Sequence, residues 1–535
     1  MAAVPADTRT SCASFAPRSL LVRRVDRSSR TRSFMEVAVL ASVASATLLG
    51  VEGQVVTVEV HVSSGLPSYT VVGLPDTAVR ESRERVRAAI LSSGLVWSNH
   101  RITVNLAPGA VRKHGAGLDL AVALGILVAT DELPADAVEG TAVLGELGLD
   151  GSVRPVPGTI ALVDTLARSG IERVVVPVAD AAEAALVRGI HVRAAAHLGE
   201  LRDCCKGEAP WPDWPPLPPP RPTEDDDVDL AEVRGLPWAR RALEAAAAGG
   251  HHLLYSGPPG AGKTMLARRL ATILGPLGPD DALEVTRIHS AAGHTPVGGL
   301  ATRRPFRAPH HTASIPALVG GGSGRPSPGE VTLAHRGALF LDELGEFLPG
   351  ALDALRQPLE ERVVRISRQA VSLTFPADFQ LVACTNPCPC GLGPPWCACS
   401  DVQRARYRRR MSAPLLDRFD LRVAVRPPEP GALPGESSAA VRARVHAAVD
   451  RQAVRYRHQP WGRNAHVPAG MLEPCLPLAA DARDAWHAEA ETRRLTGRGA
   501  ARIRRVARTL ADLDDVAEIG AAHVALAAML REDVP

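Results

Sequence analysis

The stretch from residue 252 to 274, HLLYSGPPGAGKTMLARRLATIL, limits what this chain can fold into more than any other. A short apolar run leads into a glycine-rich turn, and apolar residues at helical spacing follow, which is the strand, loop and helix setting of a phosphate-binding loop. Backbone N–H groups of such a loop point at a phosphate, and the positive end of the helix adds to the attraction. The residues predicted to hold a nucleotide are Gly257, Pro258, Pro259, Gly260, Ala261, Gly262, Lys263 and Thr264.

The scarcity of lysine strengthens this assignment. Only Lys113, Lys206 and Lys263 occur among the 535 residues, and the last stands where a lysine reaches the outer phosphates of a nucleotide. Thr264 follows it as a ligand for Mg²⁺. The motif therefore predicts ATP and Mg²⁺ as cofactors.

Length and composition predict a globular, multidomain protein in a reducing compartment. A chain of 535 residues has room for roughly three or four domains. Its net charge of +3 gives no global attraction for nucleic acid, so any such contact must be local. Five of the nine cysteines fall between residues 384 and 399, which indicates one local cysteine site and no disulfide framework. We expect a cytoplasmic protein.

The first 50 residues imitate a secretory signal. Several arginines precede the apolar run VAVLASVASATLLGV, but this run leads directly into an alternating strand at 56–62. Because a methionine also stands at position 35, we expect residues 1–34 to be a disordered arm or a misassigned start. The rest of the sequence has no run of about twenty apolar residues, so we expect no membrane span.

Strands and helices alternate from 35 to 208, which predicts an α/β domain. The segments NLAPGAVRKHGAGLDLAVALGIL and VLGELGLDGSVRPVPG resemble the proteolytic domain of the Lon family, whose fold is like domain 2 of ribosomal protein S5. In that family a serine and a lysine form a catalytic dyad, and Gly117 and Ile160 stand at those places here. The dyad cannot work without a hydroxyl nucleophile and an amine, so we expect a Lon-like fold without protease activity.

A proline-rich and acidic stretch at 209–227 is expected to be an extended linker. The P-loop domain is expected over residues 228–430, with a parallel sheet in an α/β core. In this domain the apolar run at 339–341 ends in Asp342, which is suited to hold Mg²⁺, and Glu343, which is suited to polarise the attacking water. A later apolar run ends at Asn386, whose side chain can orient water near the γ-phosphate.

Two arginines further along are candidate catalytic residues. Arg418, in the stretch PLLDRFD, cannot easily reach its own nucleotide, but it can act as a finger on the γ-phosphate of a neighbouring subunit, which implies a ring. From 436 to 535 the pattern becomes helical and predicts a small C-terminal lid, with Arg498 near the start of its third helix.

Together these motifs resemble the AAA+ ATPases of the magnesium chelatase branch, and within it the YifB/ComM family, over nearly all of residues 35–532. The most specific segments are GLPDTAVRESRERVRAAI, NLAPGAVRKHGAGLDL, RPFRAPHHTAS, LDALRQPLEE, TNPCPCG and LLDRFD. The family implies a homohexameric ATPase ring that drives branch migration of DNA junctions, notably during natural transformation. It also implies residue roles: Walker A for Lys263 and Thr264, Walker B for Asp342 and Glu343, sensor 1 for Asn386, the arginine finger for Arg418 and sensor 2 for Arg498.

Two hypotheses for the function stay open. The first is an ATP-driven motor that acts on branched or single-stranded DNA without sequence preference. Segment 363–375 predicts a hairpin, and its Arg365 and Arg368 would either hold DNA phosphates in a ring pore or serve subunit contacts. The second is a motor subunit that drives Mg²⁺ insertion into a tetrapyrrole. The Lon-like domain argues against it, because chelatase motor subunits do not carry one.

A cysteine cluster is the last candidate site. Four thiolates on one loop suit a tetrahedral Zn²⁺ site, with free thiols or a labile disulfide as the alternatives. The basic run RARYRRR at 404–410 is either a solvated face or a DNA patch. The paired His310 and His311 are more typical of hydrogen-bonded loop residues than of ligands. The cluster has the pattern CxC, six residues, CxC, and comprises Cys388, Cys390, Cys397 and Cys399.

Overall fold

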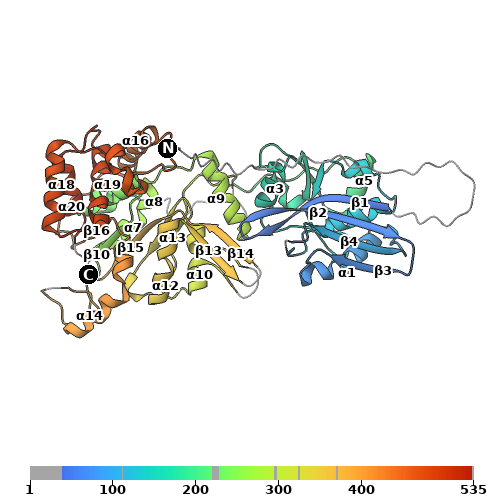
Figure 1. The fold of residues 1–535 in the computed structure, drawn as a ribbon, viewed down its shortest axis with the longest axis horizontal. Coiled ribbons are helices and arrows are strands. Elements are labelled where there is room, and N and C mark those ends of the chain that lie inside the picture. The colour runs from blue at the N-terminus through green and yellow to red at the C-terminus, as the bar shows by residue number, and fades with distance from the viewer. Residues whose placement is uncertain are drawn as a thin grey trace, which may run out of the picture.

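The computed structural model of the chain describes residues 39–110, 112–219, 228–294, 298–322, 326–368, 371–393 and 395–532. The expected arm 1–34 and residues 220–227 of the expected linker lie outside this description. The molecule is elongated, with the N-terminal sheet at one end and the C-terminal helices at the other (Figure 1). Among the described residues, no helix is long and apolar enough to cross a membrane.

The N-terminal half is built on a seven-stranded mixed sheet with the strand order β3-β4-β2-β1-β5-β8-β9. Its strands are β1 (Val39–Leu49), β2 (Glu52–Ser63), β3 (Ser68–Val72), β4 (Arg101–Ala107), β5 (Thr141–Val143), β8 (Arg173–Pro177) and β9 (His191–Ala195). A two-stranded sheet is formed by β6 (Glu146–Leu147) and β7 (Val153–Arg154). The helices are α1 (Thr77–Ser92), α2 (Asp119–Ala129), α3 (Thr159–Arg168), α4 (Val178–Ala184) and α5 (Leu198–Lys206).

Strand β1 is the apolar run that imitates a secretory signal in the sequence. It pairs antiparallel with β2 along its whole length, from Val39 opposite Val62 to Leu49 opposite Glu52. Helix α2 packs against both strands, and all of its residues are buried. Each Val or Leu side chain removed from water in this way contributes about 1.5–3 kcal/mol, so the run is stabilised as the middle of a sheet.

The second sheet is wholly parallel and has the order β11-β12-β15-β10-β16. Its strands are β10 (Leu253–Ser256), β11 (Phe306–Arg307), β12 (Ala338–Leu341), β15 (Gln380–Thr385) and β16 (Leu421–Ala424). Every residue of β10, β12 and β15 is buried, as expected for parallel strands covered on both faces. The parallel α/β core predicted from the sequence is therefore confirmed.

Helices and one hairpin surround this sheet. The predicted hairpin is formed by β13 (Val363–Arg368) and β14 (Val371–Pro376), which pair antiparallel. The helices are α6 (Pro237–Gly249), α7 (Lys263–Arg268), α8 (Leu270–Ile273), α9 (Pro279–Ala291), α10 (Ile315–Val319), α11 (Glu330–Leu333), α12 (Pro349–Ala354), α13 (Arg356–Glu361), α14 (Asp401–Arg410) and α15 (Ala413–Leu416).

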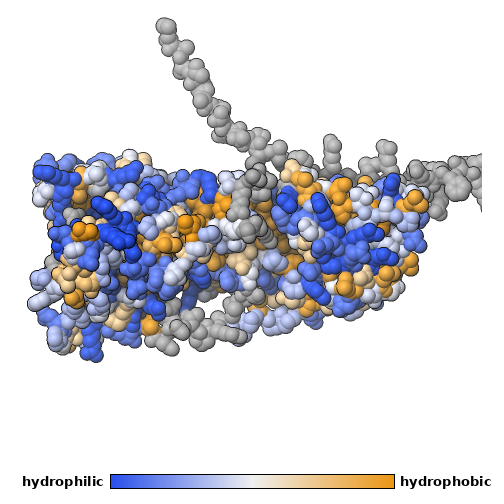
Figure 2. Space-filling view, turned by 90° about the horizontal axis from the view of Figure 1, so that it is seen from below, coloured by the Kyte–Doolittle hydropathy of each residue, from blue (hydrophilic) through white to orange (hydrophobic). Residues whose placement is uncertain are grey.

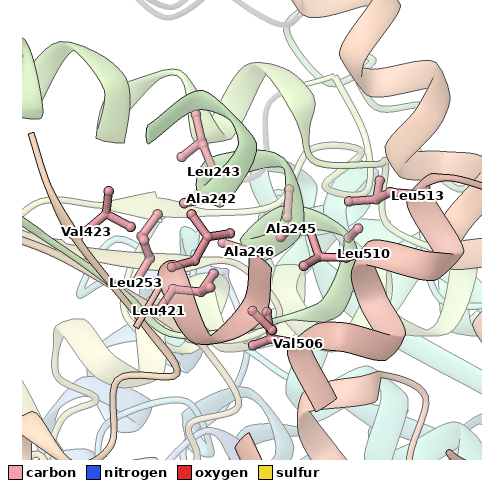
Figure 3. Close-up of a cluster of buried hydrophobic side chains, with 14 of the residues drawn as sticks. Ala242, Leu243, Ala245, Ala246, Leu253, Leu421, Val423, Val506, Leu510 and Leu513 are labelled. Carbon is pink, nitrogen blue, oxygen red and sulfur yellow. The ribbon is translucent and has the colours of Figure 1, made fainter. Parts of the chain in front are cut away.

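The C-terminal part is helical and packs onto this core. Its helices are α16 (Ser438–Arg455), α17 (Leu472–Cys475), α18 (Ala480–Thr492), α19 (Gly497–Leu513) and α20 (Ala521–Met529). Apolar residues of α19, among them Val506, Leu510 and Leu513, face those of α6 and of strands β10 and β16 in one buried cluster (Figure 3). The C-terminal helices thus share a hydrophobic core with the strand that leads into the P-loop.

The N-terminal half and the P-loop core are joined by direct packing. The turn between β1 and β2 enters the core of the second half, where Val51 is buried in one cluster with Phe375 of β14. Helix α3 packs against α9, and Nη1 of Arg287 on α9 donates to Asp164 Oδ2 on α3 at 3.0 Å. A buried hydrogen bond from Ser290 to Glu183 crosses the same interface.

Candidate active site

The parallel order of the second sheet brings three sequence-distant segments to one edge. Strand β10 lies beside β15, and β15 lies beside β12. The carboxyl ends of parallel strands meet at the same edge, so the P-loop after β10, Asn386 after β15 and Asp342 after β12 converge. They line one cavity, together with Pro259, Gly260, Ala261, Gly262, Lys263, Thr264, Met265, Glu343, Cys384 and Thr385.

Two glycines give the P-loop its shape. Gly260 and Gly262 have φ values of +77° and +87°, a region that glycine adopts without strain. A Cβ at Gly257 would clash with the backbone of Val425, so the loop start also requires glycine. Helix α7 begins at Lys263, which places the positive end of a helix at the loop. These features fit a loop that holds a phosphate chain.

The Lys263 ammonium lies inside the loop. Its Nζ donates to the carbonyl oxygens of Gly257 and Pro258 at 2.7 and 2.9 Å, and to Asn386 Oδ1 at 3.2 Å. Burial lowers the pKa of this lysine from its usual value. The predicted Walker A lysine and the predicted sensor 1 side chain are therefore in direct contact.

The predicted Mg²⁺ ligands also meet. Thr264 Oγ1 donates to Asp342 Oδ2 at 2.9 Å, and the backbone N–H of Glu343 donates to Asp342 Oδ1 at 3.0 Å. A hydroxyl and a carboxylate are hard oxygen ligands of the kind that Mg²⁺ prefers. The set fits a magnesium ion, which Thr264 and Asp342 would hold.

His311 is a neighbour of Glu343 that the sequence does not reveal as such. Its Nδ1 lies 3.4 Å from Glu343 Oε2, and its ring meets Phe347 edge-on at 6.5 Å. The His310 ring lies beside it at a tilt of 34°, with ring centroids 4.1 Å apart, and its own Nδ1 lies 2.9 Å from Thr312 Oγ1. The paired histidines in RAPHHTAS are the only sequence signal for this contact. The interpretation as loop residues fits His310, whereas His311 reaches the predicted catalytic carboxylate.

The two predicted catalytic arginines lie together, in a second cavity. Arg418 donates to Glu360 and, at 2.8 Å, to the carbonyl oxygen of Pro414. Arg418 and Arg498 line this cavity with Arg362, Arg502, Arg505, His252, His466, Asp378, Asp420 and Glu360. Neither arginine lines the P-loop cavity in the described part of the chain. The predicted catalytic set is thus divided between two places on one subunit.

The hairpin places Arg365 on β13, where its side chain is 53% exposed. Its guanidinium pairs with Glu361 at the end of α13. The side chain of Arg368 lies outside the described part of the structure.

The four cysteines of the cluster come together as the sequence predicts. Their sulfur atoms all lie within 4.8 Å of one another. Cys388 Sγ is 3.2 Å from Cys390 Sγ and 3.4 Å from Cys397 Sγ, and the last two sulfurs are 3.8 Å apart. Ligands on a tetrahedral Zn²⁺ with bonds of about 2.3 Å would be about 3.8 Å apart, so the cluster fits this ion.

Hydrogen bonds and desolvation shift the pKa values of two thiols of this cluster in opposite directions. Hydrogen bonds, first from the Leu392 backbone N–H, lower the pKa of Cys390 to about 6. Desolvation raises the pKa of Cys399 to about 12. The lowered pKa favours the thiolate form of Cys390, which is the form that binds a metal.

The Lon-like region lacks the catalytic pair at the expected positions. Ile160 is fully buried in α3, and Gly117 packs against Val156. Lys113, the one lysine nearby in sequence, is buried and donates to the carbonyl oxygen of Pro108. Its ammonium is therefore engaged in holding a turn.

A central parallel strand that enters a P-loop, with carboxylates and an asparagine on the neighbouring strands, defines a nucleotide-binding protein of the AAA+ type. Three family models match the chain: "Subunit ChlI of Mg-chelatase" over residues 58–180, "Magnesium chelatase, subunit ChlI" over 229–433, and "Magnesium chelatase, subunit ChlI C-terminal" over 435–531. The chain belongs to the YifB/ComM family of this magnesium chelatase-like group.

Relatives match over almost their whole length. An uncharacterized protein of Mycobacterium tuberculosis is 43% identical over 91% of this chain and 98% of its own length. The protein YifB of Escherichia coli is 40% identical over 92% of this chain and 97% of its own length. The competence protein ComM of Haemophilus influenzae is 39% identical over 91% of this chain and 96% of its own length. A local stretch of 96 residues, 18% of the chain, is 31% identical to Lon protease 2 of Bacillus subtilis.

Proposed function

We propose that this protein is an ATP-driven, ring-forming motor that acts on DNA, with branch migration of DNA junctions as its task. The observation that carries the ATPase part is the convergence of Lys263, Thr264, Asp342 and Asn386 at one edge of the parallel sheet. The DNA part rests on the resemblance to the YifB/ComM family and on the competence name of one relative. The proposed units are a Lon-like domain at 35–208, a linker at 209–227, an ATPase core at 228–430 and a helical lid at 436–535.

In this proposal the residues divide the work of ATP hydrolysis. The P-loop and Lys263 would hold the outer phosphates, and Thr264 and Asp342 would hold Mg²⁺, which would supply positive charge for the phosphates. Glu343 accepts a proton from the attacking water, and Asn386 orients that water. Arg418 acts on the nucleotide of the next subunit, because it lies outside the cavity of its own P-loop. Arg498 shares the cavity of Arg418, which supports a role at the same subunit boundary.

The decisive experiment uses Glu343→Gln, which keeps the shape of the side chain and removes its basicity. The variant is expected to bind ATP and to stop before hydrolysis. It should then hold forked or four-way DNA more tightly with ATP than without, and the affinity should fall steeply with salt and show little sequence preference. DNA affinity that is absent, or the same with and without ATP, would contradict the DNA motor.

A chelatase motor subunit is the second candidate, and one finding favours it. The family model matched by residues 58–180 is itself described as a subunit of magnesium chelatase. The N-terminal half therefore does not distinguish a DNA motor from a chelatase subunit, whereas the sequence analysis expected its Lon-like fold to argue against a chelatase. ATPase activity that depends on a tetrapyrrole and not on DNA would identify this alternative.

A further inference from the structure

The cysteine loop and the helix after it form one projecting unit, here called the knuckle (residues 387–393 and 395–410). Its four sulfurs lie within 4.8 Å of one another, and Ser400 and Gln403 form a capping box at the start of α14. The Arg404 guanidinium on α14 contacts the thiol of Cys397, which ties the helix to the loop. Helix α14 projects from the lower edge of the ATPase core in Figure 1.

The knuckle is anchored on the predicted ATP site. Tyr407, the one buried residue of α14, lies against Gly345 and 3.3 Å from Thr385 Oγ1, next to Asn386. Arg410 donates to the carbonyl oxygen of Gly345 and to Glu346, both at 2.9 Å and two and three residues after Glu343. At its other end, Gly391 packs so closely on Pro259 of the P-loop that a Cβ would clash. The knuckle therefore contacts the P-loop, the segment after Glu343 and the end of β15.

The outward face of the knuckle is basic and carries an exposed aromatic ring. Helix α14 contains five arginines and one aspartate, and two of the arginines, Arg404 and Arg410, have acidic partners. The other three, Arg406, Arg408 and Arg409, are exposed, and within the described residues none of them forms an ion pair. Helical spacing places Arg409 opposite the buried Tyr407, with Arg406 one turn before it on the same face and Arg408 about 100° further round the helix. Trp396 at the loop tip is 77% exposed. The view from below shows this end of the molecule covered mainly by hydrophilic residues (Figure 2).

We propose that the knuckle is a contact surface for single-stranded DNA, on which Trp396 stacks against a base and Arg406, Arg408 and Arg409 hold phosphates. An exposed indole ring and unpaired guanidinium groups on one projecting unit are the combination that binds unpaired strands, because stacking needs a base that is not already stacked in a duplex. A ten-residue helix is about 15 Å long, which matches a few nucleotides of strand. The contacts of Tyr407 and Arg410 connect the ATP site to the knuckle, so that movement during ATP hydrolysis would shift the bound DNA strand.

This inference rests on the proposed function, and the test separates the two. Affinity for a fluorescent 30-nucleotide oligothymidylate is measured with ATP in the Glu343→Gln background, over a range of salt. The knuckle variant Arg406→Gln/Arg408→Gln/Arg409→Gln should bind at least tenfold more weakly, and its slope of log affinity against log salt should be shallower by about 2, from about 0.7 for each lost phosphate contact. Trp396→Ala should bind about tenfold more weakly, and Trp396→Phe should keep most of the affinity.

A matched control is available on the exposed face of α1. Arg80→Gln/Arg83→Gln/Arg87→Gln removes the same charge from the N-terminal half and should bind as the parent does. Equal affinity of parent and both knuckle variants overturns the inference and leaves the DNA motor standing. A loss of ring assembly in the knuckle variants, seen by size-exclusion chromatography, also overturns it, since the surface then serves a neighbouring subunit. A parent protein that binds no DNA overturns the proposed function and the inference together.

Discussion

Glu343 combines two unusual features at one residue. Its φ of 52° lies in the left-handed region, which is costly for a residue with a long side chain and is commonest at functional sites. Its side chain is 56% exposed, yet the Nδ1 atom of His311 lies 3.4 Å from its carboxylate. The backbone and the imidazole together restrict where the carboxylate can point. We therefore interpret His311 as a positioning residue for Glu343.

The substitution His311→Ala tests this interpretation. Without the imidazole the Glu343 carboxylate can rotate away from the attacking water, so kcat for ATP hydrolysis should fall about tenfold, a part of the 10²–10⁴ that a positioned base contributes. KM for ATP should stay within about twofold, because His311 does not line the P-loop cavity in the described structure. His310→Ala is the matched control and should keep wild-type kcat. Equal rates for the two variants would contradict the assignment.

Motifs that are contiguous in sequence could be predicted residue by residue, and contacts across the fold could not. The P-loop residues 257–264 and the pair Asp342–Glu343 follow from local rules, because each motif carries its own strand and turn. His311 meets Glu343 across 32 residues, and Arg418 meets Glu360 across 58 residues. Such pairs depend on how the elements pack together, and the spacing of residues within one motif does not predict this packing. The placement of Arg498 beside Arg418 likewise required the packed C-terminal helices.

At the scale of elements, periodicity and apolar runs predicted most strands and helices. The parallel core, the hairpin at 363–375 and the alternation of strands and helices in the N-terminal half agree with the sequence patterns. The apolar run before residue 50 was ambiguous, because a buried strand and a signal segment have the same composition. Pairing with β2 and packing under α2 make the run a buried strand, and β2 and α2 both lie outside the run itself.

The cysteine loop leads to a prediction about metal content. Protein purified without chelators should contain about one Zn²⁺ per chain by elemental analysis, since four sulfurs lie at distances that suit a tetrahedral ion. Cys397→Ser should lower both the zinc content and the melting temperature, because one ligand of four is lost. Cys475→Ser is the control and should retain the metal, as Cys475 lies outside the cluster. Zinc near zero, with four alkylatable thiols, would favour the free-thiol alternative.

At the scale of the whole molecule, the division of the catalytic set argues for assembly. The P-loop cavity contains the residues predicted to bind phosphate, magnesium and water, while Arg418 and Arg498 line another cavity. Under the proposed function, a single subunit presents two incomplete halves of one site. Head-to-tail contact between copies would complete each half, and repeated contacts of this kind close into a ring.

Mixing two inactive variants tests this arrangement. Lys263→Ala should lose ATP binding, and Arg418→Ala should bind ATP but hydrolyse it at least about 10³-fold more slowly, as expected for a finger supplied in trans. A mixture should regain part of the activity, because an Arg418→Ala subunit supplies an intact P-loop to the intact arginine of a Lys263→Ala neighbour. ATPase rates are followed against the mixing ratio. A mixture that stays inactive at every ratio would count against a shared site.

The packing between the two halves limits how this protein can be divided. Val51 lies in the hydrophobic core of the P-loop half, beside Phe375 of the hairpin, and a Cβ at Gly50 would already touch that ring. On α9 Arg287 and Ser290 hold carboxylates of the N-terminal half. A chain that began at residue 228 would expose this apolar surface to water and leave the arginine without its acid. Cutting the stretch between 219 and 228 should therefore yield two fragments that stay together in solution. A protein that lacks the whole N-terminal half should aggregate and should not form a smaller active ATPase.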